Sequence, residues 1–115
     1  MARQTLLDLY AAATVQNTNT KLANRRDTAV DGVSAKDGKA RRVKGVIGRA
    51  TQAGYCVGLL EGEDVFTADG AILNAFTEMI PLDIPVPAGS QLTFYYYNTA
   101  GTAAASLTVL VEEPE

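Results

Sequence analysis

The sequence predicts an all-β protein, a single antiparallel β-sandwich of the jelly-roll kind or a small barrel, with an extended basic N-terminal arm. About six or seven short segments alternate between apolar and polar residues. Turn signals separate them roughly every 8–12 residues, the spacing typical of sandwiches and barrels. No helical pattern longer than about 10 residues competes with them. The 115 residues, 47% of them hydrophobic, are enough for one domain with one modest core.

The N-terminal part has a different pattern from the rest, so we divide the chain into an arm, residues 1–40, and a β-sandwich domain, residues 41–115. Thr5 and Asp8 have the spacing of a capping box, which favours a short helix in the arm. The threonines and asparagines that follow are poor helix formers and favour a strand. Both alternatives stay open, and residues 24–39 are predicted to form a turn-rich loop.

The sandwich domain is predicted to begin with a strand at residues 42–51, where Val43 lies among basic residues and glycines. Just before it, the dipeptide Asp37-Gly38 has the composition of a hairpin tip, with Val33 on its other side. This pattern predicts that the two flanking segments form an antiparallel hairpin.

The middle of the chain continues as short strands. Residues 55–60 are apolar on both alternating faces, which predicts a strand buried on both sides. A shorter strand at 65–67 ends at an Asp-Gly turn. Residues 72–76 fit either a strand or one helical turn.

The segment 78–87 alternates between aliphatic side chains and prolines, with one aspartate on the proline side. The aliphatic residues are Ile80, Leu82, Ile84 and Val86, and the residues between them are Pro81, Asp83, Pro85 and Pro87. Because proline has no N–H to donate to a neighbouring strand, this segment is predicted to lie at a sheet edge. Residues 91–97 and 106–111 are predicted to be the two last strands, with Tyr96 facing inward.

Charge is divided sharply along the chain. The first 49 residues hold all ten basic residues and only four acids, a formal charge of +6. The remaining 66 residues hold nine acids and no base, a formal charge of −9. Such asymmetry points to a charged partner or to another copy of the chain. Three interpretations stay open: pairing within one monomer, docking between subunits, and binding of nucleic acid through residues 21–49.

The candidate interface residues follow from this pattern and from the aromatic run near the end of the chain. Tyrosines that face outward from a strand form the flat, amphipathic strips that are enriched at protein interfaces. The candidates are the basic residues Arg25, Arg26, Arg41 and Arg42, the acidic residues Glu61, Glu63 and Asp64, and the outward tyrosines Tyr95 and Tyr97.

Residues for catalysis are largely missing. The chain has no histidine and no tryptophan, and its single cysteine, Cys56, lies in an apolar segment where no base can activate it. The clustered acids around residue 63 do not have the spacing of a calcium loop. We therefore predict no enzyme activity, no cofactor and no metal site. No stretch approaches the about 20 apolar residues of a membrane helix, and no signal peptide is expected.

The closing segments carry a resemblance to a known class of proteins. The sequence IPLDIPVPAGSQLTFYYYN at 80–98, followed by SLTVLVEEPE at 106–115, is similar to the closing strands of small viral capsid and decoration (cement) proteins. The resemblance implies a non-enzymatic virion subunit, made in the host cytoplasm. Such a subunit assembles with itself, and with other virion proteins, by exchanging arms and pairing basic with acidic surfaces.

Two other functions stay open. A carbohydrate- or protein-binding β-sandwich would use the outward Tyr95 and Tyr97 as its platform. A nucleic-acid-binding protein would use the basic residues within 21–49, with an affinity that falls steeply as salt rises.

Overall fold

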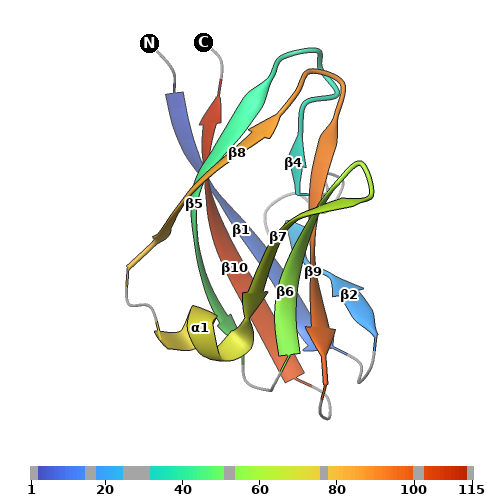
Figure 1. Cartoon of the computed structure of the whole chain (residues 1–115), viewed down its shortest axis with the longest axis vertical. Helices are drawn as coiled ribbons and strands as arrows, with labels where there is room; N and C mark the ends of the chain where they lie inside the picture. The colour runs from blue at the N-terminus through green and yellow to red at the C-terminus, as the bar shows by residue number, and fades with distance from the viewer. Residues whose placement is uncertain are drawn as a thin grey trace.

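The computed structural model describes residues 3–14, 18–24, 32–50, 54–75, 78–99 and 103–113. Among them the chain is nearly all β, as two antiparallel sheets and one short helix (Figure 1). The all-β prediction is therefore confirmed.

Sheet A holds five strands. In spatial order they are β3 (Ala23–Asn24), β1 (Arg3–Thr14), β10 (Ala103–Glu113), β5 (Arg41–Ala50) and β8 (Ile80–Val86).

Sheet B holds four strands in a row and a fifth beside them. The row is β2 (Asn19–Lys21), β9 (Gln91–Asn98), β6 (Gly54–Leu60) and β7 (Glu63–Asp69), and β4 (Val33–Ser34) also pairs with β9. The helix α1 (Gly70–Ala75) follows β7, so the segment expected as a strand or a helical turn begins as helix, with Leu73 buried in the core.

The strand pairs are nested along the chain. The first strand, β1, pairs with the last, β10; β2 and β4 pair with β9; β5 pairs with β8; and β6 pairs with its neighbour β7. Two further pairings, β10 with β5 and β9 with β6, join these pairs sideways into the two sheets. The arrangement is that of one long antiparallel ribbon, with its tip at the β6–β7 turn, wrapped so that its halves face each other.

The core lies between the two sheets because one face of each strand is apolar at every second residue. β9 shows this most clearly, since buried and half-buried residues alternate along its whole length. Phe94 of this strand meets Phe66 of β7 edge to face, with ring centroids 6.2 Å apart. The largest fully buried side chains are Tyr96, Phe94, Leu9, Leu22, Leu92, Leu107, Val33, Val43, Val46, Val86, Val109 and Val111.

The described residues of the 1–40 segment are strands of the two sheets rather than an extended arm. Residues 3–14 form β1, which pairs with β10 from Arg3 opposite Glu113 onward. The apolar side chains Leu9 and Ala11 enter the core, and this burial favours the strand over the helix. Residues 25–31 lie outside the described residues.

Two local expectations had different outcomes. The Asp37-Gly38 turn is present, but β4 before it belongs to sheet B and β5 after it belongs to sheet A, so it connects the sheets and is not a hairpin tip. The proline-rich strand β8 does lie at the edge of sheet A, with Pro81 and Pro85 exposed and Ile84 and Val86 buried, as predicted.

Candidate interaction surfaces

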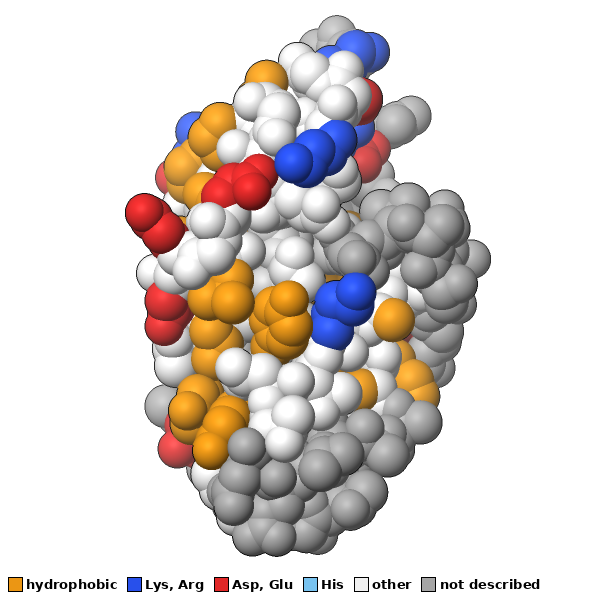
Figure 2. All heavy atoms as spheres, turned by 90° about the vertical axis from the view of Figure 1, so that its right-hand side faces the viewer, with side chains coloured by type: hydrophobic (Ala, Val, Ile, Leu, Met, Phe, Trp, Pro, Cys, Tyr) orange, Lys and Arg blue, Asp and Glu red, His pale blue; other side chains and the backbone are white. Residues whose placement is uncertain are grey.

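The outer side of sheet B carries an aromatic and aliphatic surface. On β9, Tyr96 is buried while Tyr95 and Tyr97 point outward and are half-buried, as the alternation predicts. On β6, the outward residues are Tyr55, Val57 and Leu59. We call these five outward residues of β6 and β9 the tyrosine face. Figure 2 shows hydrophobic side chains gathered on this side of the molecule, with one basic side chain beside them.

Two tyrosines of this face are stacked on each other. Tyr55 lies directly opposite Tyr97 in the β6–β9 pair, and their rings are 5.2 Å apart with an angle of 16° between their planes. Tyr55 is 38% exposed although its neighbour Cys56 is buried. The expectation of a strand buried on both sides is therefore wrong at Tyr55, because no layer of described residues covers the outside of sheet B there. The outward tyrosines of β9 were predicted, but their partner on β6 was not.

The tyrosine face continues onto the strands at its sides. Lys21 of β2 lies opposite Tyr95, Tyr95 lies opposite Val57, and Val57 lies opposite Thr67 of β7. This row places a basic side chain at one side of the apolar residues and a hydroxyl at the other.

A shallow depression of about 240 Å³ adjoins the tyrosine face at the β6–β7 turn. Its lining combines one aromatic ring with amide, hydroxyl and carboxylate groups. The lining residues are Leu59, Glu61, Gly62, Gln91, Thr93 and Tyr95.

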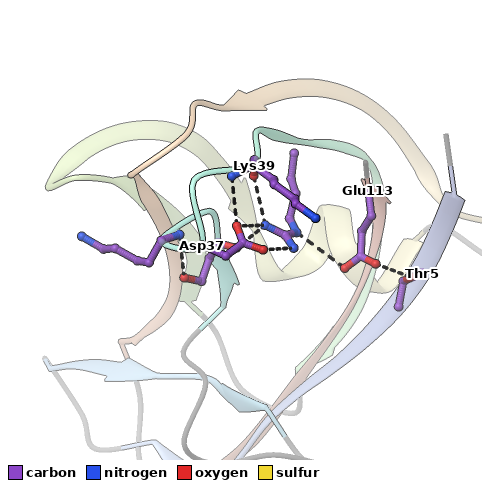
Figure 3. A network of polar contacts seen from close by, with 7 residues as sticks. Thr5, Asp37, Lys39 and Glu113 are labelled. Carbon is purple, nitrogen blue, oxygen red and sulfur yellow. Dashed lines mark hydrogen bonds and ion pairs between the residues drawn. The ribbon is translucent and has the colours of Figure 1, made fainter. Parts of the chain in front are cut away.

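The predicted basic residue Arg41 is held by groups of its own chain (Figure 3). Its guanidinium donates two hydrogen bonds of 2.9 Å to the Asp37 carboxylate and one of 3.0 Å to the Ser34 carbonyl. On its other side, Arg41 Nε lies 3.6 Å from a Glu113 carboxylate oxygen. Glu113 in turn accepts a hydrogen bond of 3.1 Å from the Thr5 hydroxyl of β1.

We call Arg41, Asp37, Glu113 and Thr5 the Arg41 cluster. The guanidinium of Arg41, with help from the backbone N–H of Lys39, holds the pKa of the Asp37 carboxyl well below its usual range. The side chain of Arg41 is only 16% exposed, so water screens these contacts less than at an open surface. The cluster ties β1, β5, β10 and the loop before β5 together at one end of the sandwich.

Arg42, the other predicted basic residue of β5, pairs with an acid of the neighbouring strand. Its guanidinium donates a hydrogen bond of 2.8 Å to Asp83 of β8, and Lys44 Nζ lies 3.7 Å from the same oxygen. These contacts, that of Arg42 first, lower the pKa of Asp83. The pair is well exposed, with 44% of the Arg42 side chain and 62% of the Asp83 side chain accessible.

The predicted acidic residues lie at and after the β6–β7 turn. Glu61 accepts a hydrogen bond from the Gln91 N–H at 3.1 Å and lies 3.5 Å from Lys36 Nζ. Asp64 accepts a hydrogen bond of 3.0 Å from the Thr67 hydroxyl. Glu63 is exposed beside them. None of these acids lies in an ion pair with Arg41 or Arg42 among the described contacts, which join each arginine to other acids.

Arg25 and Arg26 lie outside the described residues. Within the described part of the chain, the ion pairs join the basic first half to acids of both halves, as in Arg41 with Glu113 and Arg42 with Asp83. This pattern favours the interpretation that the charges pair within one monomer.

The single cysteine is buried in the core. Cys56 is 1% exposed, and burial raises the pKa of its thiol to about 12. At neutral pH it is therefore an unreactive thiol. In the described ranges no three histidine, cysteine or acidic side chains gather as metal ligands, and no helix there is long and apolar enough to cross a membrane.

The comparisons with known proteins add no relative. No protein-family model, curated protein or solved structure matches this chain.

Proposed function

We propose that this protein is a non-enzymatic structural subunit that associates with itself, of the class that builds or decorates virus particles. The observation that carries the proposal is the nested strand pairing. If β2 and β4 are counted as one strand, eight strands pair first with last and inward to the β6–β7 hairpin. That order is the one expected of a jelly roll, an architecture that recurs in viral capsid domains and in lectins.

The tyrosine face supports self-association. Interface cores are enriched in tyrosine and depleted of charged residues, and the row through Tyr95 and Val57 has this character. Arg41 and Arg42 already hold acids of their own chain. We therefore place the main contact between subunits on the tyrosine face, and give charge exchange and arm exchange a smaller part in this proposal.

The test is the mass of the purified protein in solution, measured by light scattering at about 50 mM and about 500 mM salt. An oligomer at both salts, reduced in mass by the double substitution Tyr55→Ser and Tyr97→Ser, is the expected result. The matched control is Arg42→Ser and Lys44→Ser, which changes two charged residues of β5 and keeps the tyrosine face. A monomer at both salts would contradict the proposal.

Absorbance at 260 and 280 nm in the same run tests the nucleic-acid alternative. Because the chain has no tryptophan, bound nucleic acid would dominate the spectrum. Co-purified nucleic acid that is released at high salt would favour binding through residues 21–49 over self-association.

Carbohydrate binding is a second candidate function, favoured by the depression beside Tyr95. Its aromatic, amide and hydroxyl groups, with the Glu61 carboxylate, are groups that can stack on and hydrogen-bond to a sugar ring. Binding on a glycan array by a monomeric protein, lost on Tyr95→Ala and kept on Tyr97→Ala, is the result that this function predicts.

A further inference from the structure

The two edges of sheet A differ in how they meet solvent. At β8, exposed Pro81 and Pro85 have no N–H to offer, which blocks the addition of another strand. At the other edge, β3 pairs with β1 only at Leu9 and Tyr10 among the described residues. Residues 4–8 of β1 therefore have β10 on one side and no described strand on the other. Figure 1 shows this half of β1 at the margin of the sheet, near the N-terminus.

A large apolar side chain lies in the middle of this open segment. Leu6 is 57% exposed, more than any other large hydrophobic side chain in the described residues. It points away from the core, because Leu7 packs against the core and Leu9 is fully buried. On the strand beside it, Leu110 lies directly opposite Leu6 and is half-buried. The outer side of sheet A thus has an apolar pair that ends at an open edge.

We propose that residues 4–8 of β1 pair antiparallel with the same residues of a second copy, around a two-fold axis at Leu6. The two A sheets then become one continuous sheet, and the backbone groups of both open edges pair with each other. The inference rests on the self-association proposed above and names one of its interfaces. It predicts a contact separate from the tyrosine face, so a chain with both contacts can build assemblies larger than a dimer.

The side chains choose the second copy as the occupant, because the segment is complementary to itself in this register. Gln4 lies opposite the second copy's Asp8, so an amide faces a carboxylate at both ends of the joint. Thr5 lies opposite Leu7, and Leu6 lies opposite its own symmetry mate. The Leu6–Leu110 pair of each subunit then meets that of the other in one apolar row across the joint.

Other registers are poorer. Since two sheets that continue across a two-fold axis must keep their inner faces on the same side, the register can shift only by two residues at each opposing position. A shift toward the C-terminus puts Leu6 opposite a carboxylate, that of Asp8, and brings the second copy against β3 at Leu9. A shift toward the N-terminus leaves Leu6 opposite the amide of Gln4. Only the register centred on Leu6 joins apolar to apolar and amide to carboxylate.

Disulfide trapping tests the register directly. Opposing Cβ atoms in an antiparallel pair lie about 4.5–5.5 Å apart, close to the reach of a disulfide. The native Cys56 does not interfere, because it is buried and the pKa of its thiol is raised to about 12. Under mild oxidation at about pH 8, Leu6→Cys is expected to form a covalent dimer. Gln4→Cys and Asp8→Cys should each stay uncrosslinked alone and crosslink when mixed.

A second variant tests the contact without new covalent bonds. Leu6→Lys places two like charges opposite each other, so the mass of the assembly should fall at least twofold and the dissociation constant should rise about tenfold or more. The matched control is Val65→Lys on β7, which changes a 38% exposed side chain at the edge of the other sheet and should leave the mass unchanged.

The outcomes separate the two proposals. If the wild-type protein is an oligomer, but Leu6→Cys does not crosslink and Leu6→Lys keeps the mass, the β1 interface is overturned while self-association stands. If the wild-type protein is a monomer even at high concentration, both proposals fail. Crosslinking of Gln4→Cys with itself would show another register and overturn the one proposed here.

Discussion

The outer sides of the two sheets are built differently, although their inner sides follow the same alternation. On sheet A, Arg42 and Lys44 of β5 share Asp83 of β8, so charged side chains cover this side. On sheet B, Tyr55 stacks on Tyr97 and no described residue covers them as a further layer. The core therefore specifies the fold with both sheets equally. The outer sides differ in use: one is fastened within the chain, and the other offers apolar surface.

The largest expected effect separates inside from outside on a single strand. Phe94→Ala removes a fully buried ring that packs on Phe66, and should lower the free energy of unfolding by about 3–5 kcal/mol. Tyr95→Ala, its outward neighbour, should lower it by only about 1 kcal/mol. Urea unfolding followed by circular dichroism measures both. Equal losses would mean that the outside of sheet B is covered as the inside is.

The next effect concerns the Arg41 cluster. Arg41→Ala removes the two hydrogen bonds to Asp37, the contact with Glu113 and the bond to the Ser34 carbonyl. Because this side chain is mostly buried, we expect a loss of about 2 kcal/mol in the free energy of unfolding. Chemical denaturation provides the measurement, and Arg41→Lys should recover only part of the loss since lysine cannot form the paired bonds. An unchanged midpoint for Arg41→Ala would contradict the role given to the cluster.

Acid sharpens the same point. The pKa of Asp37 in the folded protein is lowered from an ordinary value of 3.8, so its contribution to stability is complete above that value and is lost as the pH falls below it. Thermal melting between about pH 7 and about pH 2.5 should show a steeper decline below about pH 4 for the wild type than for Asp37→Asn. Identical declines would show that Asp37 is not held by Arg41 in solution.

The smallest effect belongs to the charged side of sheet A. Arg42→Ala breaks a well-exposed pair with Asp83, and should change the free energy of unfolding by less than about 0.5 kcal/mol. Added salt should reduce even that difference, because exposed pairs are screened. The same denaturation series as for Arg41→Ala gives the value. A loss as large as that of Arg41→Ala would mean that the two sides of β5 do not differ as described.

Local patterns in the sequence were enough for much of this molecule. The prolines of 78–87 predict an edge strand, and the alternation around Tyr96 predicts which tyrosines face outward, because both depend only on residues close in the chain. The structure agrees with both.

The remaining features depend on pairings between distant residues. Thr5 and its neighbours are a strand because β10 lies beside them, and no local pattern separates that strand from a short helix. The stack of Tyr55 on Tyr97 requires the β6–β9 register, and the contact of Arg41 with Glu113 requires β5 to lie beside β10. The proposed interface at Leu6 follows from the short β3, which shows itself only in the folded sheet.

The nested pairing also sets the order in which the molecule can be completed. β10 is the central strand of sheet A, yet it follows every other described strand in the chain, and it pairs Glu113 with Arg3. On a ribosome, the innermost hairpin of β6 and β7 can pair while the later residues are still being made, whereas β1 and β5 wait for the strand between them. Until that strand emerges, the apolar sides of both are uncovered, so this protein closes from its middle outward and is most prone to aggregation just before its last strand arrives.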